Sequence, residues 1–113
     1  MIGLNKLYEL DLGREFIEEV IDVYLEEIPQ YLKAAQESFD NEKKEDLKRN
    51  IHTLKAHSSM LEMPGINLKL KYWENEVLAQ PLSDFEADFN LIKSAFEKAL
   101  YELKILQSTG SSF

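Results

Sequence analysis

Apolar residues recur at steps of three and four along most of this chain, the spacing that gathers side chains on one face of an α-helix. Four segments carry this pattern, at about residues 14–39, 42–61 and 66–79 and from about residue 83 onward. None of them alternates apolar and polar residues strictly, as a half-buried strand would. Four amphipathic helices with short connections predict an all-α fold, an antiparallel up-down four-helix bundle with a short N-terminal capping helix at about residues 3–10.

Local signals predict where these helices begin and bend. Pro29 lies inside the first helix and is expected to kink or interrupt it. Asp40 or Asn41 is the expected N-cap of the second helix, because short polar side chains satisfy the first backbone N–H groups. The S-D-F-E sequence at residues 83–86 has the capping-box pattern and predicts the start of the last helix.

Length and composition narrow the class of protein. A chain of 113 residues is long enough for one domain with a single hydrophobic core. Its Ser- and Gly-rich end is expected to fray, so the bundle should cover residues 1–107 and a disordered tail residues 108–113. The chain has no cysteine, which excludes disulfides, zinc–thiolate sites and thiol catalysis.

Charge and hydropathy restrict the partners. The start lacks the apolar run of a signal peptide, and no segment reaches the ~18 apolar residues of a membrane helix. We therefore expect a cytoplasmic protein that makes no membrane contact. The net charge of −8, from 21 acidic and 13 basic residues, also makes nucleic acid an unsuitable partner.

The residue with the strongest chemical signal is His52, in the second segment. The apolar stripe of that helix consists of Leu47, Ile51, Leu54 and Leu61, with Ser58 among them. His52 points roughly 140° away from this stripe at 100° per residue, and we therefore expect it in solvent. On or beside its face lie Lys48, Lys55, Ala56 and Ser59. An exposed imidazole among cationic and small side chains suits a nucleophile that meets a bulky partner bearing a phosphoryl group.

These residues carry a family resemblance. The run H-T-L-K at residues 52–55, with Ala56 and Ser58 after it, resembles the H-x-L-K-G-S-S signature of histidine-containing phosphotransfer (HPt) domains. A Glu-Glu-Ile-Pro segment precedes it and a Gly-Ile pair follows it, as in that family, and the similarity covers roughly residues 5 to 105. Ala56 and His57 depart from the Gly and Ser that the family most often has. The resemblance implies a helical bundle that passes a phosphoryl group between the aspartates of response-regulator receiver domains.

Roles for individual residues follow. His52 is the expected phosphoryl acceptor, since neutral imidazole is a good nucleophile near pH 7. Lys55 is expected to stabilise the charge of the phosphoryl oxygens, and Ser59 to donate a hydrogen bond to them. Lys48, Arg49 and Ala56 are expected to contact the partner.

No P-loop, Gly-rich phosphate loop or kinase motif occurs in the chain, so its phosphoryl group has to come from another protein. The expected protein is a phosphoryl carrier without a kinase active site of its own, and a monomer. Receiver domains are its expected partners, with a hybrid histidine kinase as a further candidate. No cofactor is expected on this domain, and the resemblance implies Mg²⁺ on the receiver.

Other classes of function stay open. A non-catalytic helical-bundle adaptor, which binds a receiver domain or another signalling protein, would keep the fold and tolerate loss of His52. A hydrolase or metalloenzyme has less support, because no carboxylate–histidine motif and no thiol are present. His52 and His57 are five residues apart and face different sides, so no metal site is expected between them. Tyr24 and Ile17 are candidates for an apolar docking patch beside His52.

Overall fold

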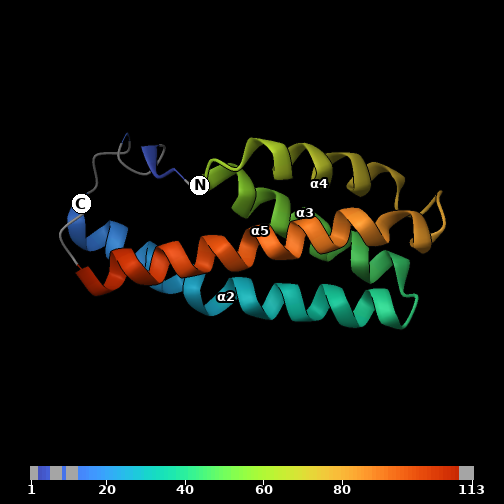
Figure 1. The fold of residues 1–113 in the computed structure, drawn as a ribbon, viewed down its shortest axis with the longest axis horizontal. Coiled ribbons are helices and arrows are strands. Elements are labelled where there is room, and N and C mark those ends of the chain that lie inside the picture. The colour runs from blue at the N-terminus through green and yellow to red at the C-terminus, as the bar shows by residue number, and fades with distance from the viewer. Residues whose placement is uncertain (1–2, 6–8, 10–12, 110–113) are drawn as a thin grey trace.

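A computed structural model describes residues 3–5, 9 and 13–109 of the chain. Its helices are α2 (Arg14–Asp40), α3 (Lys44–Met60), α4 (Pro64–Glu76) and α5 (Leu82–Thr109). Each helix packs against the next one, and α5 also packs against α2, which closes the bundle. The chain reverses direction at every connection, as Figure 1 shows. The predicted all-α up-down four-helix architecture is therefore confirmed.

The N-terminal residues meet the connection between α3 and α4. The backbone N–H of Gly3 donates to the carbonyl of Leu61 over 2.9 Å, and Leu4 is buried. The backbone N–H of Asn5 donates to the Glu62 carboxylate over 2.6 Å. The short capping helix predicted at residues 3–10 lies largely outside the described residues, so it stays a prediction.

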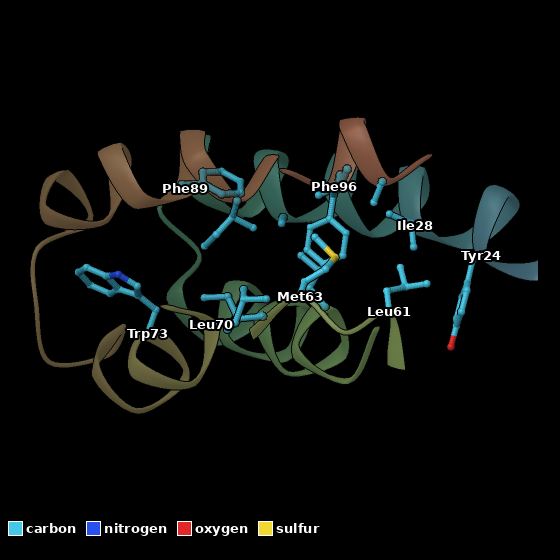
Figure 2. Close-up of a cluster of buried hydrophobic side chains, with 14 of the residues drawn as sticks. Tyr24, Ile28, Leu61, Met63, Leu70, Trp73, Phe89 and Phe96 are labelled. Atoms are coloured by element: carbon cyan, nitrogen blue, oxygen red, sulfur yellow. The ribbon is translucent and has the colours of Figure 1, made fainter. Parts of the chain in front are cut away.

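The core follows the predicted apolar stripes. Side chains from all four helices fill the space between them. Figure 2 shows this for Tyr24 and Ile28 of α2, Leu70 and Trp73 of α4, and Phe89 and Phe96 of α5. Phe85, Phe89 and Phe96 of α5 are almost completely buried, and so are Leu47, Ile51 and Leu54 of α3. Burial of these apolar faces is the main force that holds the bundle together. It fixes α3 with one side in the core and the opposite side in solvent.

Pro29 does not interrupt the first helix, which runs unbroken from Arg14 to Asp40. Proline in a helix lacks one backbone hydrogen bond, to the carbonyl four residues earlier. Here Ile28 beside it is fully buried. The packing of the apolar stripe on both sides of Pro29 stabilises the continuous helix.

The predicted N-caps are wrong. Asp40 is the last residue of α2 and Asn41 is its C-cap, whereas the N-cap of α3 is Lys43. The reason is a Schellman-type ending, in which Glu42 has a positive φ of 56° and the Lys43 N–H donates to the Ser38 carbonyl over 2.8 Å. The polar residues expected to begin one helix thus end the previous one.

The boundaries of the last two helices also differ from the prediction. α4 begins at Pro64 rather than at residue 66, because proline is well suited to the first turn of a helix. It ends at Glu76 rather than at residue 79. α5 begins at Leu82, so Ser83 is not its N-cap, and it continues to Thr109, past the boundary expected at residue 107. The rest of the predicted tail, residues 110–113, lies outside the described residues.

Candidate functional site

His52 lies on the solvent side of α3, with its side chain 68% exposed. The opposite side of the helix is anchored by Leu47, Ile51 and Leu54, all buried. A residue five positions after Leu47 and two before Leu54 must face away from the stripe that they form. The exposure predicted for His52 from the apolar pattern is therefore present in the structure, on a helix whose position the core fixes.

A carboxylate from the next helix holds this imidazole. The Nδ1 atom of His52 is 2.8 Å from Oε2 of Glu74, which comes from α4. The other carboxylate oxygen, Oε1, is 2.6 Å from the Nζ atom of Lys55. Glu74 therefore bridges the histidine and the lysine, which lie one helical turn apart on α3.

The electrostatics of this group of three residues favour a charged Glu74. Partial burial acts to raise the pKa of Glu74, but hydrogen bonds and charges from Lys55 and His52 outweigh it and hold the pKa below its usual value. An ionised carboxylate only accepts hydrogen bonds, so the His52 nitrogen that faces it has to donate. The proton of the neutral ring then sits on Nδ1, which leaves the lone pair on Nε2.

A shallow hollow of about 560 Å³ lies beside His52, between α3 and α4. Lys48, Arg49 and Leu78 line it together with the imidazole and Glu74. Lys48 and Arg49, the two cationic residues expected to contact a partner, thus lie beside His52. The guanidinium of Arg49 is ion-paired with Asp46 on its own helix. Leu78 is 47% exposed, which adds an apolar surface at the far edge of the hollow.

Comparison with known families identifies the family to which this helical bundle belongs. The profile of the family described as Hpt domain matches residues 19–104, a range that contains α3, α4 and the His52 site. The chain belongs to the Hpt domain family. No curated protein and no solved structure matches the chain.

In this Hpt domain Ala56 is exposed on α3, one turn beyond His52. Ser59 lies seven residues after His52, about 10 Å along the helix axis at 1.5 Å per residue. It lines a different hollow, with Glu62, Met63 and Asn67. The structure thus does not bring Ser59 to the imidazole, and only Lys55 of the two predicted phosphate-stabilising residues is next to the Glu74 bridge.

Sequence reasoning missed Glu74. It is 22 residues away from His52 in sequence and belongs to another helix, so no local motif connects them. One feature nevertheless indicates that Glu74 lies close to another helix. Glu74 follows the buried Trp73 and precedes the buried Val77, so the Hpt domain carries a carboxylate at the edge of an apolar stripe. Such a position faces a neighbouring helix more often than open solvent.

The second histidine has quite different surroundings. The ring centroid of His57 lies 5.2 Å from that of Tyr24 and 5.8 Å from that of Tyr31, both on α2. Its Nε2 atom is buried without a hydrogen-bond partner. Burial lowers the pKa of His57, and the nearby Glu27 carboxylate opposes this. Tyr24 and Ile17 are themselves buried, so the apolar docking patch expected from these two residues is absent.

Within the part of the chain that the structure describes, no three His, Cys, Asp or Glu side chains gather in a way that would hold a metal ion. No helix among the described residues is both long and apolar enough to cross a membrane.

Proposed function

We propose that this Hpt domain accepts a phosphoryl group on Nε2 of His52 from the aspartyl phosphate of one receiver domain and passes it to the aspartate of another. It would thus act as a carrier in a multistep two-component phosphorelay. Membership of the Hpt family supports a role in histidine phosphotransfer in general. The observation that supports the role of His52 is its exposed ring, held through Nδ1 by a charged Glu74.

The chemical step needs no proton transfer before attack. The lone pair on Nε2 attacks the phosphorus in line, a P–N bond forms, and the P–O bond to the aspartate breaks to release its carboxylate. The ring of the resulting phosphohistidine carries a positive charge while Nδ1 keeps its proton. The Glu74 carboxylate, 2.8 Å from Nδ1, stabilises that charge. Reversal of the same step delivers the phosphoryl group to the next receiver.

Lys55 supplies positive charge near the reacting group. Its Nζ atom is 2.6 Å from Glu74, so the ammonium is held on the same side of α3 as the imidazole. Phosphoryl transfer gains most from positioning and from stabilisation of charge on the phosphoryl oxygens. Lys48 in the adjacent hollow adds a second positive charge from the preceding turn. Together they provide a local positive field in a chain of net charge −8.

The partner supplies the rest of the site in this proposal. The receiver domain brings the aspartate and the Mg²⁺ that neutralises phosphoryl oxygens, and it docks over His52 and the small side chain of Ala56. Lys48 and Arg49 contact its acidic pocket. A hybrid histidine kinase is a further candidate partner upstream of the first receiver.

The decisive experiment uses a receiver domain labelled at its aspartyl phosphate. Wild-type protein is compared with His52→Gln and with the matched control His57→Gln. We expect acid-labile, base-stable label on wild type and on the control, and none on His52→Gln. If several receivers bind the protein without transferring any label, the domain is instead an adaptor. Label that survives on His52→Gln would place the acceptor elsewhere.

A further inference from the structure

A second contact between α3 and α4 lies two helical turns from Glu74. Asn67 precedes Glu74 by seven residues on α4, so both side chains face α3. The Nδ2 atom of Asn67 donates to the backbone carbonyl of Lys55 over 3.1 Å and to Oγ of Ser58 over 3.0 Å. The Ser58 hydroxyl in turn donates to the same Lys55 carbonyl over 2.7 Å.

The orientation of the Asn67 amide follows from its partners. A backbone carbonyl only accepts hydrogen bonds, so the atom of Asn67 that faces the Lys55 carbonyl must be the NH₂ group. The Ser58 proton is already donated to that carbonyl, which leaves the Ser58 oxygen as the second acceptor for Asn67. Ser58 is fully buried, so this contact lies inside the seam between the helices rather than on the surface.

Lys55 is therefore held by α4 at two points. Asn67 binds its backbone carbonyl, and Glu74 binds its side-chain ammonium. The apolar packing that also joins the two helices is non-directional. Hydrogen bonds weaken steeply with distance and angle, so the Asn67 contact, which joins α4 to the backbone of α3, resists sliding of α4 along α3. A slide of one residue, about 1.5 Å, would lengthen or misalign the hydrogen bond between Glu74 and His52.

We propose that Asn67 is a positioning residue for the phosphoryl acceptor. By fixing the register of α4 on α3, it places the Glu74 carboxylate against Nδ1 of His52 and so keeps the attacking lone pair on Nε2. The expected effect of Asn67 on phosphoryl transfer rests on the proposed function of His52. Its expected effect on the tautomer of the His52 ring does not.

The first test reads the ring itself. Nitrogen-15 NMR of the His52 imidazole distinguishes the two neutral tautomers, because the protonated and unprotonated nitrogens have well-separated shifts. In wild type we expect one dominant Nδ1–H form. In Asn67→Ala we expect the two ring shifts to approach each other as the tautomers mix. The control is Asn75→Ala, since Asn75 is on the same helix and its side chain donates to the carbonyl of Lys71 in that helix. A folded protein with an unchanged His52 tautomer would overturn the proposal.

The second test measures transfer in a double-mutant cycle. Asn67→Ala should slow phosphoryl transfer roughly 10-fold, because misplacing a reacting group by about 1 Å can cost up to about 100-fold. In a Glu74→Ala background the same substitution should have no further effect, since Asn67 acts through Glu74. Equal loss in both backgrounds would contradict a positioning role. If Asn67→Ala does not fold, Asn67→Ser, whose hydroxyl is too short to reach Lys55, takes its place in both tests. Absence of label in every variant would reject the proposed function, while the NMR result would still decide the role of Asn67.

Discussion

His52 and His57 lie five residues apart on the same helix, yet their surroundings differ in almost every respect. His52 is 68% exposed and has a carboxylate on Nδ1. His57 is only partly exposed, packs against the rings of Tyr24 and Tyr31, and has a buried Nε2 without a hydrogen-bond partner. The two imidazoles are chemically identical, so the difference comes from the helix face on which each one lies.

The two faces of α3 give the two histidines different surroundings. The face of α3 toward α4 carries polar partners for His52, and the face toward α2 carries aromatic rings for His57. A nucleophile needs an accessible nitrogen with a defined tautomer, whereas a packing residue needs complementary shape. The histidine signature of the family is therefore informative here only together with the position of each residue around the helix.

The largest expected difference is in reactivity toward a small reagent. Diethyl pyrocarbonate acylates accessible neutral imidazole nitrogens, and His57 can react at Nε2 only when its surroundings open locally. We expect His52 to react roughly 100-fold faster than His57, or more, because local opening costs free energy. Peptide mass mapping over time assigns each modification, and the His52→Gln protein isolates the slow reaction. Equal rates at the two residues would show that their imidazole nitrogens are equally accessible.

For folding stability the order of the two histidines should be reversed, with His57 contributing more than His52. His57→Ala should lower the free energy of unfolding by about 1–3 kcal/mol, because it leaves a cavity between two tyrosine rings. His52→Ala should change it by less than about 0.5 kcal/mol, as is usual for an exposed position. Urea denaturation measures both.

A third variant tests the cause of that ranking. His57→Phe keeps a ring of similar shape but removes the unpartnered buried nitrogen, so its stability should equal or exceed that of wild type. Stability as low as that of His57→Ala would mean that Nε2 does have a partner in solution.

Lys55 belongs to the surroundings of His52 alone, and its removal should therefore affect transfer more than folding. We expect Lys55→Ala to slow phosphoryl transfer about 10-fold, since it removes a charge that stabilises the phosphoryl oxygens. Its unfolding free energy should fall by no more than about 1 kcal/mol, because a partly exposed ion pair contributes little. Lys71→Ala, an exposed lysine on α4, is the matched control. A large fall in melting temperature with normal transfer would assign Lys55 to folding instead.

The sequence predicts the His52 side of this comparison well, because helical periodicity is a local property. The stripe of Leu47, Ile51 and Leu54 suffices to place His52 in solvent. Glu74 could not be predicted in the same way. Its contact with His52 depends on the register of α4 on α3, which is determined by side chains in both helices and by the connection between them.

The errors at helix ends have a related cause. Glu42 and Glu62 both have a positive φ, 56° and 54°, at the residue after a helix cap. Glycine is the usual residue in that conformation, so glutamate gives no signal of a helix end there. The prediction of Asp40 or Asn41 as an N-cap failed for this reason. The fold class did not depend on them, because it follows from the number of apolar stripes and the short connections between them.

The smallest expected effect is a pH dependence of stability that comes from His57 alone. Burial lowers the pKa of His57, against the opposing influence of Glu27. The unfolded chain therefore takes up the imidazole proton near pH 6.5, and the folded protein takes it up only at lower pH. Between those two values the unfolded state binds more protons, so stability falls as the pH is lowered below about 6.5. The loss stops once the pH is below the pKa of His57 in the fold.

Carboxylates take up protons at lower pH than histidine, so their effect on folding stability can be separated from that of His57. The pKa values of Glu74 and Asp88 are both lowered, so their contributions to stability disappear only in more acidic solution. Urea denaturation from about pH 7.5 to about pH 5.5 should thus show a decline in wild type that is absent in His57→Phe. Parallel pH profiles would mean that His57 is protonated as readily in the bundle as in the unfolded chain, and that the two tyrosine rings do not exclude water from it.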